Sequence, residues 1–140
     1  MFARDSSLGS DKEGSTSPRI LVVEDDFLVA DQMEKVLETA GFTIAAVVAS
    51  AEDAIKAAAD HKVDLAIMDI RLSSKRDGID AALELYRTLQ IRCLFATAHS
   101  DPAIQKRAEP ARPLGWLQKP YSMASLLQSV RSAIETLDRS

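Results

Sequence analysis

The chain has 140 residues, a net charge of −4 and a single cysteine. This length suits one domain with its own core. No run approaches the roughly 18 apolar residues that cross a bilayer, and the first residues lack the apolar core of a secretory signal, so we expect no membrane association and a cytoplasmic protein. No block of Lys or Arg exceeds two residues, which argues against direct nucleic-acid binding. Cys93 lies in an apolar run and is predicted to be a buried, unreactive side chain.

Residues 1–18 are rich in Ser, Gly and Asp, a composition that predicts a flexible N-terminal tail. From Arg19 to residue 138, short apolar runs alternate with segments of helical period. That alternation predicts one α/β domain, built as a five-stranded parallel sheet with helices on both faces.

The first strand is expected at residues 20–23, followed by a helix over about 26–40 that Gly41 ends. A second strand at 44–48 leads to a helix that Ser50 caps and that ends near His61. The third strand, 64–68, is followed by a long loop and then by a helix that carries Ile79 and Leu89.

The fourth strand is expected at 92–96, and Asp101-Pro102 begins the next helix. That helix must be short, because Pro110 and Pro113 are incompatible with a helix interior. The fifth strand is expected at 115–118, before a last helix that Ser122 caps and that runs to about Leu137.

Charged residues follow three of these strands: Glu24-Asp25 the first, Asp69 the third and Lys119-Pro120 the fifth. Parallel strands bring their carboxyl ends to one edge of the sheet, so these residues are expected to converge. Carboxylates with water suit Mg²⁺, and an aspartate can itself attack phosphorus. Lys119 and the Thr97 hydroxyl could stabilise charge on a phosphoryl group. The alternative is that each acid only caps the following helix.

From about Arg19 to Leu137, the order of these residues resembles the receiver domains of two-component response regulators. The resemblance implies a flavodoxin-like (βα)5 fold in which Asp69 accepts a phosphoryl group from a histidine kinase or a phosphotransfer protein. It also implies a cis Lys119–Pro120 peptide and phosphoryl contacts from Thr97 and Lys119. The Mg²⁺ ligands that it implies are Glu24, Asp25, Asp69 and the backbone carbonyl of Arg71.

Further positions are expected to tune or transmit the signal. Trp116, three residues before Lys119, occupies the aromatic switch position of receivers, although it could simply be a packing residue. Arg71 and His99 are expected to flank the phosphoryl group, or else to point into solvent. Phe95-Ala96-Thr97 resembles a Phe-Ala-Thr subgroup of receivers, but Ala98-His99 replace its Gly and aromatic residue. The loop after Asp69 lacks the usual Met-Pro.

The expected function is that of a single-domain response regulator, because no residues remain for a second domain. Phosphorylation would switch a protein-interaction surface formed by the fourth helix, the fifth strand and the fifth helix, without enzymatic turnover beyond self-catalysed phosphotransfer and dephosphorylation. A phosphorylation-independent interaction module and a phosphate shuttle or sink remain open. An aspartyl-phosphate phosphatase is disfavoured because Arg71 stands where its second aspartate belongs, and a flavodoxin-like electron carrier because Glu24-Asp25-Asp26 would repel its phosphate.

Overall fold

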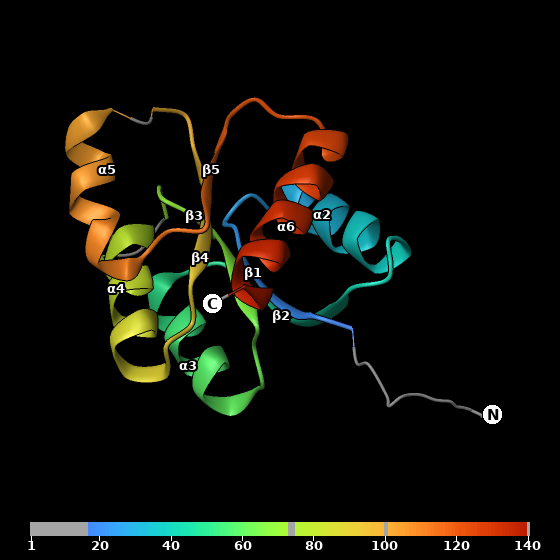
Figure 1. Cartoon of the computed structure of the whole chain (residues 1–140), viewed down its shortest axis with the longest axis horizontal. Helices are drawn as coiled ribbons and strands as arrows, with labels where there is room; N and C mark the ends of the chain where they lie inside the picture. Colours follow the sequence, from blue (N-terminus) through green and yellow to red (C-terminus); the bar gives the residue numbers. More distant parts are fainter. Residues whose placement is uncertain (1–16, 73–74, 100, 140) are drawn as a thin grey trace.

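The computed structural model describes residues 17–72, 75–99 and 101–139, and its centre is one five-stranded sheet. The strands lie in the order β2-β1-β3-β4-β5, and every neighbouring pair is parallel (Figure 1). The predicted parallel sheet is therefore confirmed. The strands are β1 Arg19–Val23, β2 Thr43–Val48, β3 Leu65–Asp69, β4 Cys93–Thr97 and β5 Gly115–Gln118.

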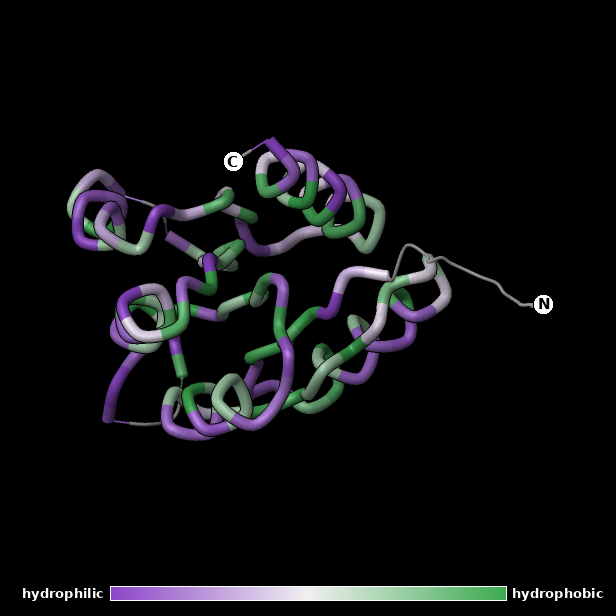
Figure 2. Tube along the Cα trace, turned by 60° about the horizontal axis from the view of Figure 1, so that its bottom comes forward, coloured by the Kyte–Doolittle hydropathy of each residue, from purple (hydrophilic) through white to green (hydrophobic). Residues whose placement is uncertain are grey.

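Helices cover both faces of the sheet, as predicted (Figure 1). Helices α2 (Phe27–Thr39) and α6 (Met123–Asp138) pack on one face, where Met33 and Leu126 belong to the same buried cluster. The other face carries α3 (Ala51–Asp60), α4 (Gly78–Leu89), α5 (Pro102–Ala108) and a 3-10 helix, η1 (Glu109–Ala111). Figure 2 shows that the long helices are hydrophobic on one side and hydrophilic on the other.

The apolar pattern of each element explains this layering. All five residues of β3 and of β4 are buried, because these central strands have helices on both sides. Helix α3 packs closely through alanines, whereas α4 inserts Ile79 and Leu85 into the core. Full burial of a side chain such as Leu85 contributes about 1.5–3 kcal/mol.

The predicted element ends are accurate to within one or two residues. Ser50, Asp101 and Ser122 each cap a helix by accepting a backbone N–H bond, at the positions that the sequence predicts. The sequence predicts that Asp69 and Thr97 follow their strands, but they are the last residues of β3 and β4. Helix α5 ends at Ala108, and Pro110 lies in η1.

The described chain begins against the edge strand β2. Thr43 N–H donates to the carbonyl of Pro18 at 3.0 Å, and the hydroxyls of Ser17 and Thr43 are in contact. The rest of the predicted flexible tail, residues 1–16, lies outside the described residues, as do Ser73 and Ser74 of the long loop. Among the described helices, none has the length and apolar character that crossing a membrane requires.

Cys93 is buried, as predicted, at the start of β4. Burial raises the pKa of its thiol to about 12, so the thiol stays protonated at neutral pH. A protonated, inaccessible thiol is a poor nucleophile, which supports the packing role that the sequence indicates.

Candidate functional site

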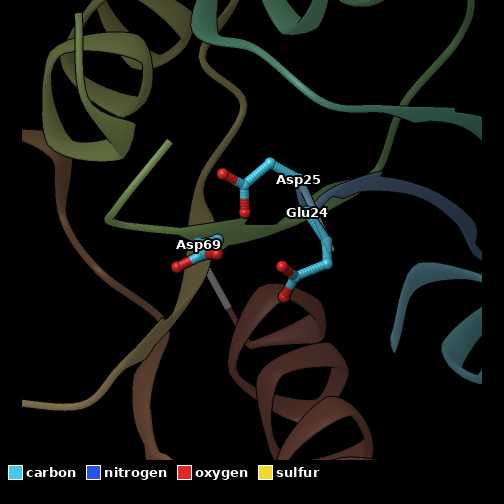
Figure 3. A group of neighbouring side chains, drawn as sticks. All are labelled: Glu24, Asp25 and Asp69. Atoms are coloured by element: carbon cyan, nitrogen blue, oxygen red, sulfur yellow. The ribbon is translucent and has the colours of Figure 1, made fainter. Parts of the chain in front are cut away.

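Three carboxylates gather where β1 and β3 end, and Figure 3 shows them facing a common space. Val23 of β1 pairs with Met68 of β3, so Glu24 is brought beside Asp69. One oxygen of each of Glu24, Asp25 and Asp69 lies within 4.8 Å of the others. Glu24 and Asp69 are 4% and 3% exposed, whereas Asp25 is exposed. This donor set fits a hard divalent cation, with an open side toward solvent.

Helix capping does not explain these acids. Asp26 is the residue that caps α2, since its Oδ1 accepts the N–H groups of Leu28 and Val29 at 3.1 and 3.2 Å. Glu24 accepts the N–H of Asp26 at 3.0 Å, and Asp69 Oδ1 accepts that of Arg71 at 3.2 Å. These bonds orient the two buried carboxylates at the strand ends, and neither carboxylate caps a helix.

Lys119 is the cation that faces this cluster. Its Nζ lies 3.1 Å from Asp69 Oδ2 and 3.7 Å from Glu24 Oε1. The pairing of β4 with β5 positions Lys119. Thr97 pairs with Gln118, and the N–H of Lys119 donates to the Thr97 carbonyl at 2.8 Å. The Lys119–Pro120 peptide bond is cis, the form that the resemblance implies.

Burial raises the pKa of Glu24 to about 7. The negative charge of Asp69 adds to this rise, while the bond from Asp26 N–H and the charge of Lys119 oppose it. Two buried carboxylates facing one lysine therefore share an excess of negative charge. Near neutral pH, a proton or a bound cation can offset that excess.

Thr97, the last residue of β4, is 6% exposed and lies next to the cluster. Its hydroxyl donates to the carbonyl of His99 at 2.9 Å and accepts the N–H of His99 at 3.1 Å. The single hydroxyl proton is thus used by the β4–α5 loop. The side chains of Ala98 and His99 are exposed.

A cavity of about 470 Å³ opens beside the cluster. Glu24, Lys119 and Ala98 form part of its wall, together with apolar surface from Val29 and Met123. Tyr121 also lines it, and burial together with the nearby carboxylates raises the pKa of this phenol to about 12. No sequence motif identifies Tyr121, although its place two residues after Lys119 is a signal that it lies near the site.

Trp116 is half-buried, and its ring stacks on that of Phe95 with the centroids 4.9 Å apart. It packs against the core under α3, α4 and α5. A packing role is therefore visible, and its role as a switch stays a prediction. The Arg71 side chain is exposed, and its predicted roles toward phosphate and metal also stay predictions.

Two contacts near the site were missed from the sequence. Gly78, the first residue of α4, lies against the backbone of Asp69 and donates its N–H to the carbonyl of Ile70 at 2.8 Å. The Asp77-Gly78 pair is visible in the sequence but indicates only a helix start. Arg107 of α5 bonds to Asp77 and Asp80, a contact between residues 27 and 30 positions apart that no local pattern indicates.

Comparison with known proteins yields a consistent group of relatives. The family model for the response regulator receiver domain matches residues 20–131. The chain is 30% identical over 125 residues to the transcriptional regulatory protein PdtaR of Mycobacterium tuberculosis, covering 89% of this chain and 60% of PdtaR. It is 27% identical over 128 residues to the phyllosphere-induced regulator PhyR of Methylorubrum extorquens, covering 90% of this chain and 47% of PhyR. The chain thus spans less than two thirds of either regulator.

Solved structures agree with the sequence matches. The signal receiver domain of a modulated diguanylate cyclase from Desulfovibrio desulfuricans superposes with a TM-score of 0.79 at 31% identity, over 88% of this chain and 98% of that one. A CheY-like receiver domain protein from Methanospirillum hungatei superposes with a TM-score of 0.81 over 89% and 98% of the two chains, and at 19% identity it shows the fold alone. The five parallel strands, the acidic cluster and these matches together show that the chain belongs to the response regulator receiver domain family.

Proposed function

We propose that Asp69 is a phosphoacceptor whose modification switches a protein-interaction surface of this domain. The observation that carries the proposal is the buried Asp69 carboxylate with Lys119 Nζ at 3.1 Å, inside a cluster of acids that is open to solvent on one side. A structural ion pair alone would not need the buried carboxylate of Glu24 beside Asp69, since repulsion between two buried carboxylates is costly.

The proposed donor is a phosphohistidine on a histidine kinase or a phosphotransfer protein. An oxygen of Asp69 forms a bond to phosphorus as the phosphorus–nitrogen bond breaks, and the electron pair leaves on the imidazole, which takes up a proton. The product on this chain is an acyl phosphate. The 470 Å³ cavity lined by Glu24 and Lys119, the two neighbours of Asp69, is the proposed route of approach for the donor side chain.

Glu24, Asp25 and Asp69 are the side chains that would hold Mg²⁺, with the Arg71 carbonyl as a further proposed ligand. When bound, Mg²⁺ supplies positive charge that stabilises the phosphoryl oxygens. Lys119 would stabilise the phosphoryl group, because its ammonium already lies 3.1 Å from Asp69 Oδ2. Thr97 can donate to the phosphoryl group once its proton leaves the His99 carbonyl.

The output we propose is a change on the surface formed by α5, β5 and α6, which a downstream protein would recognise. Thr97 supports this proposal, since its hydroxyl bonds the loop that leads into α5. Trp116 lies on β5 of the same surface. We infer a signalling role without turnover of a separate substrate, because the acceptor carboxylate belongs to the chain itself. We also propose that the protein acts in the cytoplasm.

Intact mass after incubation with acetyl phosphate and Mg²⁺ tests the proposal. The wild type is expected to gain the mass of one phosphoryl group, whereas Asp69→Asn gains none. Asp64→Asn, a change in an exposed aspartate before β3, is the matched control and should gain mass like the wild type. Lack of any gain in the wild type, with acetyl phosphate and with a phosphorylated kinase, would favour a phosphorylation-independent interaction module.

A further inference from the structure

Helix α5 is weakly anchored by apolar contacts. It has seven residues, of which Ala108 is buried and Ile104 half-buried, while the other five are exposed. By contrast, α4 buries five residues in the core. Since apolar burial is the main source of packing energy, α5 is the easier of these two neighbouring helices to displace.

Ionic hydrogen bonds join α5 to α4. The guanidinium of Arg107 donates to both carboxylate oxygens of Asp77 at 2.7 and 2.9 Å, and to Asp80 at 2.8 Å. The two-pronged contact to Asp77 has the geometry in which arginine binds carboxylates most strongly. The three side chains are 34–44% exposed, so dissolved ions can screen these contacts.

The two carboxylates that Arg107 contacts belong to the start of α4. Asp77 caps α4, and Asp77 and Asp80 each accept a backbone N–H bond from the other. The next residue, Gly78, lies against the backbone of Asp69. The C-terminal half of α5 is therefore fixed to the rigid helix end that adjoins the phosphoacceptor.

The N-terminal end of α5 is connected to the same site by a different route. Thr97 donates its hydroxyl proton to the His99 carbonyl, and Asp101, two residues further on, caps α5. A phosphoryl group on Asp69 would compete with His99 for that proton, because a hydroxyl has only one to donate. Loss of the Thr97–His99 bond would loosen the N-terminal end of α5, and movement of the whole helix would then require the Arg107 contacts to break.

We propose that Arg107, with Asp77 and Asp80, is an ionic latch that holds α5 in its unphosphorylated position and opposes the response to phosphorylation. The latch rests on the proposed function, since it needs a phosphoryl group at Asp69 as the trigger. By thermodynamic linkage, a contact that favours the unphosphorylated arrangement lowers the affinity of the site for a phosphoryl mimic.

The test is calorimetric titration of beryllofluoride, a phosphoryl mimic, into the full chain with Mg²⁺. Arg107→Ala is expected to bind the mimic roughly twofold to fivefold more tightly than the wild type, the range that a partly exposed ion pair allows. Lys106→Ala, which removes an exposed lysine of the same helix, should bind like the wild type. Raising the salt concentration should shrink the difference between Arg107→Ala and the wild type, because salt screens the latch.

Hydrogen exchange of the unphosphorylated protein provides the second readout. Arg107→Ala should increase exchange at α5 amides and leave α4 protected. Asp80→Asn, which keeps the size of the side chain, should weaken the latch in the same direction and serves if Arg107→Ala does not fold. Equal or weaker binding of the mimic by both variants would overturn the latch, as would loss of protection in α4. Failure of the wild type itself to bind the mimic would instead overturn the proposed function.

Discussion

Gly78 lies so close to Asp69 that it leaves no room for a side chain. A Cβ on Gly78 would be 2.0 Å from the backbone oxygen of Asp69 and 2.9 Å from its carbonyl carbon. Backbone atoms cannot yield as a flexible side chain would, so any larger residue must push α4 away from β3. Asp69, the proposed phosphoacceptor, is thus held in place by the start of the following helix.

Gly78→Ala should therefore lower the free energy of unfolding by about 2 kcal/mol or more, despite the better helix propensity of alanine. It should also slow phosphorylation by acetyl phosphate, because the Asp69 backbone must move. Urea unfolding and intact mass against time measure the two effects. Gly41→Ala is the control: Gly41 has a φ of 100°, so alanine is strained there too, but the site is remote. If both variants phosphorylate equally fast, the close contact at Gly78 does not position Asp69.

The stability of the metal-free protein should depend on pH through Glu24. Its pKa is about 7 in the folded protein and 4.5 for an unperturbed glutamate. Between pH 4.5 and pH 7 the folded state therefore keeps a proton on Glu24 that the unfolded state has lost. This contribution to stability is complete below about pH 4.5 and is lost as the pH rises through 7. The loss amounts to about 3 kcal/mol.

Urea unfolding in EDTA at several pH values, for the wild type and Glu24→Gln, measures this contribution. The free-energy difference between the two proteins should shift with rising pH in favour of Glu24→Gln, which carries no charge at this position. Gln can still accept the Asp26 N–H bond that Glu24 accepts. A difference that stays constant across the range would show that Glu24 does not hold this proton.

Binding of Mg²⁺ should release a proton near neutral pH, because the cation and the proton compete for Glu24. The apparent affinity for Mg²⁺ should therefore rise between pH 6 and pH 8. Calorimetry in two buffers of different ionisation enthalpy counts the protons released. Glu24→Gln should bind Mg²⁺ more weakly and with a flatter pH dependence. Equal proton release by the two proteins would contradict the assignment of Glu24 to the metal site.

Arg71 should lengthen the lifetime of the acyl phosphate. Its N–H donates to Asp69 at 3.2 Å, and we expect its exposed guanidinium to pair with the phosphoryl oxygens and shield them from water. Arg71→Ala is expected to lose the phosphoryl group about threefold to tenfold faster, the effect of one charge-assisted hydrogen bond. Arg87→Ala, at an exposed position in the last turn of α4, is the control. Unchanged decay in Arg71→Ala would remove Arg71 from the site.

The sheet and the convergence of the acids could be predicted because both follow from local patterns. Apolar runs identify strands such as β3, and the parallel arrangement then brings Glu24, Asp69 and Lys119 to one edge. The close approach of Gly78 could not be predicted, because it depends on how a helix end sits on a neighbouring strand. The same holds for Arg107, whose carboxylate partners are set by the packing of α5 on α4.

The hydrogen bonding of the Thr97 hydroxyl could not be predicted from the sequence either. Its place after the fourth apolar run predicts a hydroxyl at the site, but not that its proton is given to the His99 carbonyl. Whether a loop carbonyl competes with a ligand for one proton depends on the backbone path of two residues. For Trp116, the sequence could not indicate that the ring stacks on Phe95.

The decisive measurement is to locate the phosphoryl group on the chain. After reaction with acetyl phosphate and Mg²⁺, borohydride reduces an aspartyl phosphate to homoserine, which peptide mass spectrometry assigns to a position. We expect homoserine at position 69 in the wild type, and none there when Mg²⁺ is chelated or in Lys119→Met. Homoserine at another aspartate, or none in a protein that carries phosphate, would contradict the assignment of Asp69 as the phosphoacceptor.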